Sequence, residues 1–150
     1  DIAAREAMLL GSLYAGLGLA NAGVTAVHSL SYPLGGKYGI SHGLANTIML
    51  PRVMAFNLAG VPEKFTDIAE AMGEVVEGRS IRETAYLAVE AVEGLIEDCG
   101  IMTTLEELEI PEDDFEELAK AAMTVARPLA NNPRRMTLED MVELYQEAYS

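Results

Sequence analysis

The stretch SIRETAYLAVEAVEGLIEDCG (residues 80–100) predicts one long amphipathic helix over residues 81–98. Ser80 followed three positions later by Glu83 forms a capping box, which marks the start of the helix, and Gly100 is a natural C-terminal stop. The apolar residues recur at helical spacing and form one face: Ile81, Ala85, Ala88, Val89, Val92, Leu95 and Ile96. We therefore expect this helix to cover a hydrophobic core with one side.

The rest of the chain has the same helical character. Further helices are predicted over residues 2–20, 22–31, 42–50, 52–58, 62–72, 112–125 and 138–148, with a short helical turn over 104–108. Pro33 and the glycines that follow it predict a loop, Ser41 is a candidate N-cap, and residues 131–133 predict a turn. No segment alternates with the period of a strand. The expected fold is one all-α, bundle-like domain of seven or eight helices.

Charge is distributed unevenly over the 150 residues. Residues 1–60 have a net charge of +1 and residues 61–150 a net charge of −15. Because charged side chains stay in water, we expect a buried first part covered by a solvated second part. Nucleic-acid binding is excluded, since it requires a basic surface that this chain does not have.

Residues 7–30 carry no charged side chain, and a segment of this length could span a bilayer. Four glycines and polar residues within it favour a helix buried inside a protein instead, so no membrane association is expected. The single cysteine, Cys99, excludes an internal disulfide and fits a reducing, cytoplasmic location. The chain starts at Asp1 without an initiator methionine or leader pattern, so we interpret it as a piece of a longer protein.

The chain has only two histidines, His28 and His42, and they are its main candidates for chemistry. Neutral imidazole binds Fe²⁺, Zn²⁺ and similar ions. A Pro/Gly-rich stretch separates the two, so they should lie on different helices, with His42 in a first turn where the helix dipole disfavours protonation. The spacing alone leaves hydrogen-bonded core histidines as an alternative, and a catalytic site needs a third protein ligand that this region does not offer.

The sequence around the histidines resembles the iron-containing alcohol dehydrogenase family. The likeness rests on these segments: Asn21-Ala22-Gly23 with His28, Pro33-Leu34-Gly35, Ser41-His42-Gly43-Leu44-Ala45-Asn46, Leu50-Pro51 and Phe56-Asn57. It continues at both ends of the chain, in residues 4–8 and in Asn132-Pro133-Arg134 with residues 137–140.

This resemblance implies a two-domain, dehydroquinate synthase-like enzyme with an N-terminal α/β domain that binds NAD or NADP and a helical C-terminal domain. The family's metal is held between the domains by an Asp-x-x-x-His pair and two further histidines, which correspond to His28 and His42. Residues 1–150 would then be the helical, metal-binding C-terminal domain. The Asp-x-x-x-His pair and the N-terminal nucleotide-binding domain are absent from this sequence.

Position 32 departs from the family pattern, because many members have a histidine where this chain has Tyr32. In those members the histidine has been assigned to proton relay or substrate contact. Tyr32 is therefore our candidate catalytic residue, with a packing residue in the pocket wall as the alternative. Its hydroxyl can donate a hydrogen bond, although an unperturbed tyrosine has a pKa near 10.

The implied reaction interconverts a small alcohol and an aldehyde or ketone, with hydride passing to or from the nicotinamide. The implied cofactors are a divalent metal, Fe²⁺ first and Zn²⁺ second, together with NAD or NADP. The expected partners are the missing N-terminal domain and further copies in a homo-oligomer. Without the upstream ligands the 150 residues alone should be inactive. The alternative is a non-catalytic helical interaction or oligomerisation module derived from this family.

Overall fold

The computed structural model describes residues 1–101 and 104–150. Its elements are α1 (Ile2–Ala22), α2 (Ala26–Tyr38), α3 (His42–Leu58), α4 (Pro62–Ala71), α5 (Ile81–Asp98), the 3-10 helix η1 (Glu112–Asp114), α6 (Phe115–Met123), α7 (Ala126–Ala130) and α8 (Leu138–Glu147). The described residues contain no strand, so the expected all-α class and the number of helices are confirmed.

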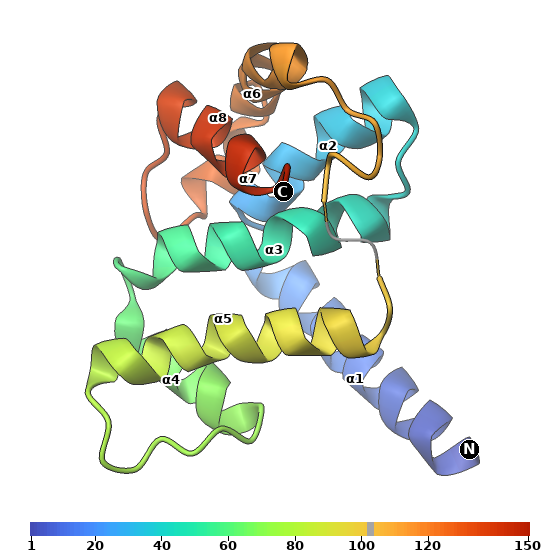
Figure 1. Ribbon diagram of the computed structural model, residues 1–150. Helices are drawn as coiled ribbons and strands as arrows, with labels where there is room; N and C mark the ends of the chain where they lie inside the picture. Colours follow the sequence, from blue (N-terminus) through green and yellow to red (C-terminus); the bar gives the residue numbers. More distant parts are fainter. Residues whose placement is uncertain (102–103) are drawn as a thin grey trace.

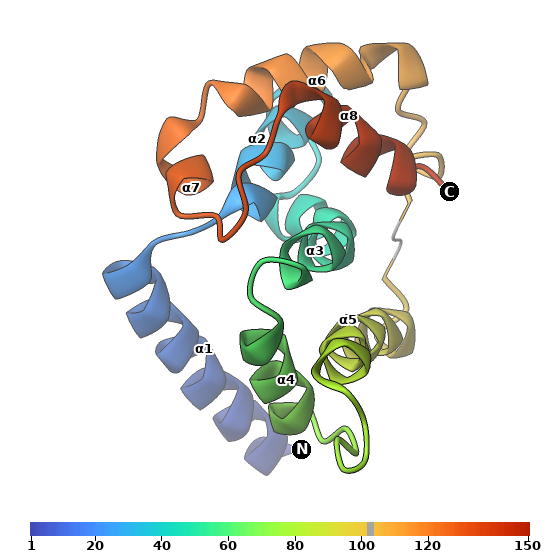
Figure 2. The ribbon, with the colours of Figure 1, turned by 90° about the vertical axis from the view of Figure 1, so that its left-hand side faces the viewer.

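Helix α3 lies between two groups of helices. Figures 1 and 2 show α2, α6, α7 and α8 on one side of α3 and the pair α4 and α5 on the other. The larger core lies between α3 and the first group and includes Leu30, Ile48 and Tyr145. The smaller core is formed by α4, α5 and the end of α3, around Phe65 and Ala88. Both groups of helices therefore rest on the same helix, which begins with His42.

Capping boxes fix the starts of two helices, and the one at Ser80 is the box predicted from the sequence. In α5 the Ser80 hydroxyl accepts from the Glu83 N–H, and the Glu83 carboxylate accepts from the Ser80 N–H at 2.8 Å. Thr137 and Asp140 make the same reciprocal pair at the start of α8. The predicted apolar face of α5 is correct for its middle residues but not for Ile81 and Leu95, which are 54% and 56% exposed. Ile96, next to Leu95, is buried as predicted, so the predicted face of α5 is only partly covered near its ends.

The loop predicted from Pro33 is wrong, because α2 continues through Pro33 to Tyr38. Leu30 and Leu34, one turn apart on either side of the proline, are both fully buried. Their burial outweighs the poor helix propensity of the intervening sequence. The helix ends instead at Gly39, whose φ of 70° lies in the left-handed region that glycine adopts readily.

The break predicted at Pro51 is also absent, since α3 is one helix from His42 to Leu58. Pro51 is buried inside it, and Ile48, Met49 and Val53 around it are in the larger core. Packing on both sides of the proline keeps the helix continuous although one backbone donor is lost.

Smaller differences concern the C-terminal third. The helix predicted over 112–125 is divided into η1 and α6, and the short helix α7 was not predicted. Where a turn of helix was predicted over 104–108, residues 106–109 form a hydrogen-bonded turn instead. Leu105 and Ile110 at these turns are nevertheless buried in the larger core.

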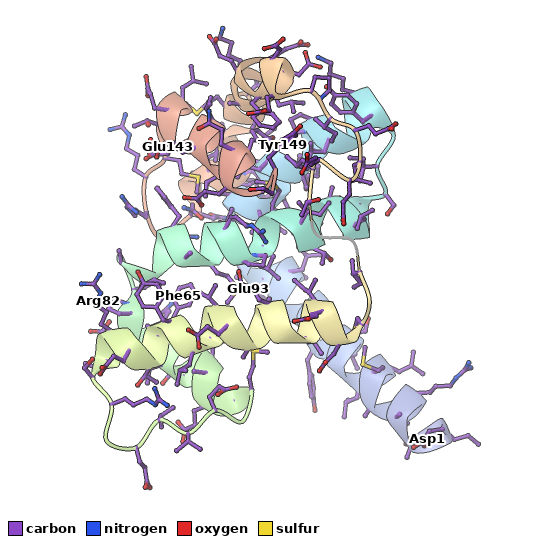
Figure 3. All side chains as sticks on the ribbon, in the orientation of Figure 1. Asp1, Phe65, Arg82, Glu93, Glu143 and Tyr149 are labelled. Carbon is purple, nitrogen blue, oxygen red and sulfur yellow. The ribbon has the colours of Figure 1, made fainter. Side chains whose placement is uncertain are left out.

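Helix α1 differs most from expectation, because none of its residues is buried. Leu13 and Leu17, for example, are 58% and 53% exposed. Figure 3 shows its side chains near Asp1 extending away from the other helices. The buried first part that the charge pattern predicts therefore begins at α2, and the apolar surface of α1 has no partner among the described residues.

No single described helix is long and apolar enough to cross a bilayer; α1 and α2 pass that test only as a pair, with a bend of 103° between them.

Candidate functional site

The two histidines lie on consecutive helices that pack against each other. His28 is in the first turn of α2, and His42 is the first residue of α3. Gly39 ends α2 and donates its N–H to the Gly35 carbonyl, so the connection between the helices occupies only residues 39–41. Gly35 permits this tight path, since a Cβ there would lie 3.3 Å from the Ile40 carbonyl oxygen.

All three residues singled out from the sequence come together at this point. The ring centroids of His28 and His42 are 5.1 Å apart, and the Tyr32 ring is 6.2 Å from His28 and 5.8 Å from His42. Tyr32 stacks on His42 with an angle of 17° between the rings, and it is 43% exposed. His28 is half-buried and His42 is exposed, so the cluster lies at the surface of the helical body.

Burial lowers the pKa of the His28 imidazole, and the neighbouring His42 ring lowers it further because two positive charges would repel. The neutral form, which has the lone pair that binds a metal, is favoured at His28 as a result. The sequence analysis expected the neutral form at His42 as well, from its place at the start of a helix, and that stays a prediction.

A hollow of about 660 Å³ opens beside His28. One wall is α1, with Ala15 and Leu19, and the other wall is formed by His28 together with Asn46 and Leu50. The wall is mostly apolar with a few polar groups, which is the usual composition of a small-molecule site. The hollow therefore places an apolar compartment next to the His28 imidazole.

The spacing of the two rings is compatible with a shared metal ion. Two imidazoles bound to one tetrahedral ion through nitrogens about 2 Å away would have centroids roughly 5 Å apart, and here they are 5.1 Å apart. The described residues contain no group of three or more His, Cys, Asp or Glu side chains suited to a metal. Within the described residues, His28 and His42 would be two ligands of such a site, and a third would have to come from elsewhere.

Hydrogen bonds from two asparagines near the C-terminal end of the chain hold the start of α2, where His28 lies. The Asn132 Oδ1 accepts from the Ala26 N–H at 3.4 Å, in the first turn of α2, and Asn132 and Asn57 exchange two amide hydrogen bonds of 2.9 and 2.7 Å. Asn131 donates to the carbonyls of Ala22 and Val24, in the connection from α1 to α2. The turn over 131–133 therefore fixes the start of α2 against the end of α3.

Asn46 is the site residue that sequence reasoning missed. Its Nδ2 lies 2.9 Å from the Nε2 of His42, and the residue also lines the hollow. The available signal was its position four residues after His42, which puts both side chains on one face of a helix.

Comparison with known protein families gives one match along nearly the whole chain. Residues 1–149 match the C-terminal part of the Fe-containing alcohol dehydrogenase family.

Individual relatives agree with this match. Lactaldehyde reductase of Escherichia coli K12 is 44% identical over 149 residues, which are 99% of this chain and 39% of that protein. The 1,3-propanediol dehydrogenase of Citrobacter freundii is 39% identical over 99% of this chain and 38% of its own length. The crystal structure of a 1,3-propanediol oxidoreductase superimposes with a TM-score of 0.97 at 38% identity, over 99% of this chain and 39% of that one. The chain therefore spans about two fifths of the length of these relatives.

Proposed function

Since the chain belongs to the Fe-containing alcohol dehydrogenase family, we propose that it is the helical C-terminal domain of a metal-dependent, NAD(P)-linked alcohol dehydrogenase. The reaction would interconvert a small alcohol and an aldehyde or ketone. The observation that carries this proposal is the convergence of two imidazoles, 5.1 Å apart, beside an apolar hollow.

In this proposal His28 and His42 hold a divalent ion, Fe²⁺ first and Zn²⁺ as the alternative, from the helical side. The ion supplies Lewis-acid chemistry, polarising a carbonyl oxygen or lowering the pKa of an alcohol. His28 suits this role because its pKa is lowered by burial and by His42, which keeps a lone pair available. The remaining ligands come from the part of the protein outside these 150 residues.

Tyr32 is the proposed hydrogen-bonding residue for the substrate. Its ring is stacked on His42, and its 43% exposure leaves it open to an adjacent molecule. A phenol at this point can donate a hydrogen bond to a substrate oxygen, or hold a proton there, without a change in net charge.

The remaining partners are proposed on the same basis. NAD or NADP is bound mainly by an N-terminal α/β domain, and the apolar surface of α1 is covered in the whole protein by that domain or by another subunit of a homo-oligomer. Exposed apolar surface of this extent on one helix favours such a partner. We keep the cytoplasm as the expected location.

Metal titration of the 150-residue chain tests the proposal. Zn²⁺ binding followed by calorimetry should be weak, with one ion per chain, and should be abolished in both His28→Ala and His42→Ala. Cys99→Ser is the matched control, because Cys99 is the single cysteine of the chain, it is exposed, and a thiolate is also a good zinc ligand. Binding that survives loss of either histidine would contradict the proposal, as would turnover of simple alcohols by this chain with NAD or NADP.

The exposure of α1 favours a second candidate, a non-catalytic oligomerisation module. On that reading the histidine substitutions have no effect on any binding property, while self-association depends on α1. The two readings are separated by measuring metal affinity and oligomeric state in the same set of variants.

A further inference from the structure

The imidazole of His42 already has a partner within the chain. The Nδ2 of Asn46 is 2.9 Å from the His42 Nε2, one helical turn along α3. An amide nitrogen carries only donors, so this contact is a hydrogen bond in the tautomer that has Nε2 as the acceptor and the ring proton on Nδ1. The lone pair of Nε2 is therefore engaged by Asn46.

The same amide is incompletely satisfied at its other end. Among the described residues, the Oδ1 of Asn46 is the buried side-chain oxygen or nitrogen that has no hydrogen-bond partner. Leaving such an acceptor unpaired is costly, and a native group in this state calls for an explanation. The hydrogen bond to His42 thus sets the orientation of the Asn46 amide, and in this orientation Oδ1 accepts no hydrogen bond.

We propose that Asn46 is a positioning residue that holds the His42 ring by Nε2 in the metal-free chain and competes with a metal ion for that nitrogen. The inference rests on the proposed role of His42 as a ligand. A ring nitrogen has one lone pair, so an ion bound at Nε2 excludes the Asn46 hydrogen bond. Release of the amide lets it turn, and Oδ1 can then meet a donor in the hollow that Asn46 lines.

The proposal determines the direction of a mutational effect. Loss of a purely supporting residue would weaken metal binding, because the ligand would lose its orientation. Loss of a competing hydrogen bond strengthens metal binding instead. One neutral hydrogen bond corresponds to a gain of about two- to tenfold in affinity.

The first experiment needs no substitution. Imidazole ¹⁵N chemical shifts of the metal-free chain, at a pH about two units above the ordinary His pKa of 6.5, should show His42 protonated on Nδ1 with Nε2 as a hydrogen-bond acceptor. Addition of Zn²⁺ should shift the Asn46 side-chain amide signals together with the His42 Nε2 signal. A His42 ring protonated on Nε2, or Asn46 signals that stay fixed while His42 binds zinc, would overturn the inference.

The second experiment measures Zn²⁺ affinity of Asn46→Leu, with Asn21→Leu as the control. Asn21 is an exposed helical asparagine whose Nδ2 donates to the Leu17 carbonyl of its own helix, so the same substitution there should leave zinc affinity unchanged. Asn46→Leu should bind zinc about two- to tenfold more tightly; equal or weaker binding refutes the competition. Failure of the unmodified chain to bind zinc would instead refute the proposed function, while the metal-free ¹⁵N measurement still tests Asn46.

Discussion

Replacement of Asn132 by alanine should be among the most destabilising changes of a half-buried polar side chain in this protein. Its partner Asn57 is only 6% exposed, and in the variant both ends of that amide lose their bonds of 2.9 and 2.7 Å. A buried amide left without partners costs about 1–3 kcal/mol. The Ala26 N–H also loses its 3.4 Å acceptor, which adds up to about 1 kcal/mol.

The expected loss is therefore about 3 kcal/mol in the free energy of unfolding, or roughly 6–12 °C in Tm for a chain of this size. Urea unfolding followed by far-UV circular dichroism measures it. Asn131→Ala is the control: its side chain is exposed and its bonds to Ala22 and Val24 are 3.2 and 3.3 Å, so it should cost about 1 kcal/mol or less.

A double-mutant cycle separates the amide pair from other effects of the substitution. Asn57→Leu combined with Asn132→Ala removes both halves of the pair, so the double variant should lose less stability than the two single losses added together, by about 1 kcal/mol or more. Two results would refute the idea that this amide pair holds α2 against α3: a loss of unfolding free energy below about 1 kcal/mol for Asn132→Ala, or strictly additive losses in the cycle.

Three further predictions follow from other contacts. Tyr145→Phe removes the hydroxyl that donates to the Leu30 carbonyl at 2.6 Å in the larger core, and urea unfolding should show a loss of about 1–2 kcal/mol, whereas the exposed Tyr14→Phe should show none. Hydrogen bonds from the Tyr38 hydroxyl and then the Lys37 ammonium lower the pKa of Asp114. The stability that these bonds contribute is present above the unfolded pKa near 3.9 and is lost as the pH falls through the lower folded pKa. In Asp114→Asn the urea midpoint should therefore lack this loss of stability in acid, and a pH profile equal to that of the unmodified chain would contradict the prediction. Self-association of the chain through α1, measured by analytical ultracentrifugation, should be weaker in the double variant Leu13→Glu/Leu17→Glu. The control is Glu143→Gln, on the exposed surface of α8 and labelled in Figure 3, which should leave self-association unchanged.

Features that depend on residues close together in the chain could be predicted from the sequence alone. The capping boxes at Ser80 and Thr137 set the starts of α5 and α8, since their hydrogen bonds reach only three residues. The absence of period-two patterns determined the all-α class, and the segments around His28 and His42 indicated the family. Each of these signals is local, so no knowledge of distant contacts was needed.

Other features depend on contacts between distant parts of the chain, which local rules do not describe. Prolines 33 and 51 lie inside helices because the core residues on both sides of each are buried, and that burial is a property of the packed molecule. Helix α1 is exposed although it is apolar, because burial needs a partner surface and the described residues supply none. The convergence of His28 and His42 likewise depends on how α2 packs on α3. It also depends on the hydrogen bond between Asn132 and Ala26, which are 106 residues apart. Contacts at that separation are chosen by the balance of all packing in the fold, and the residues next to each histidine do not specify them.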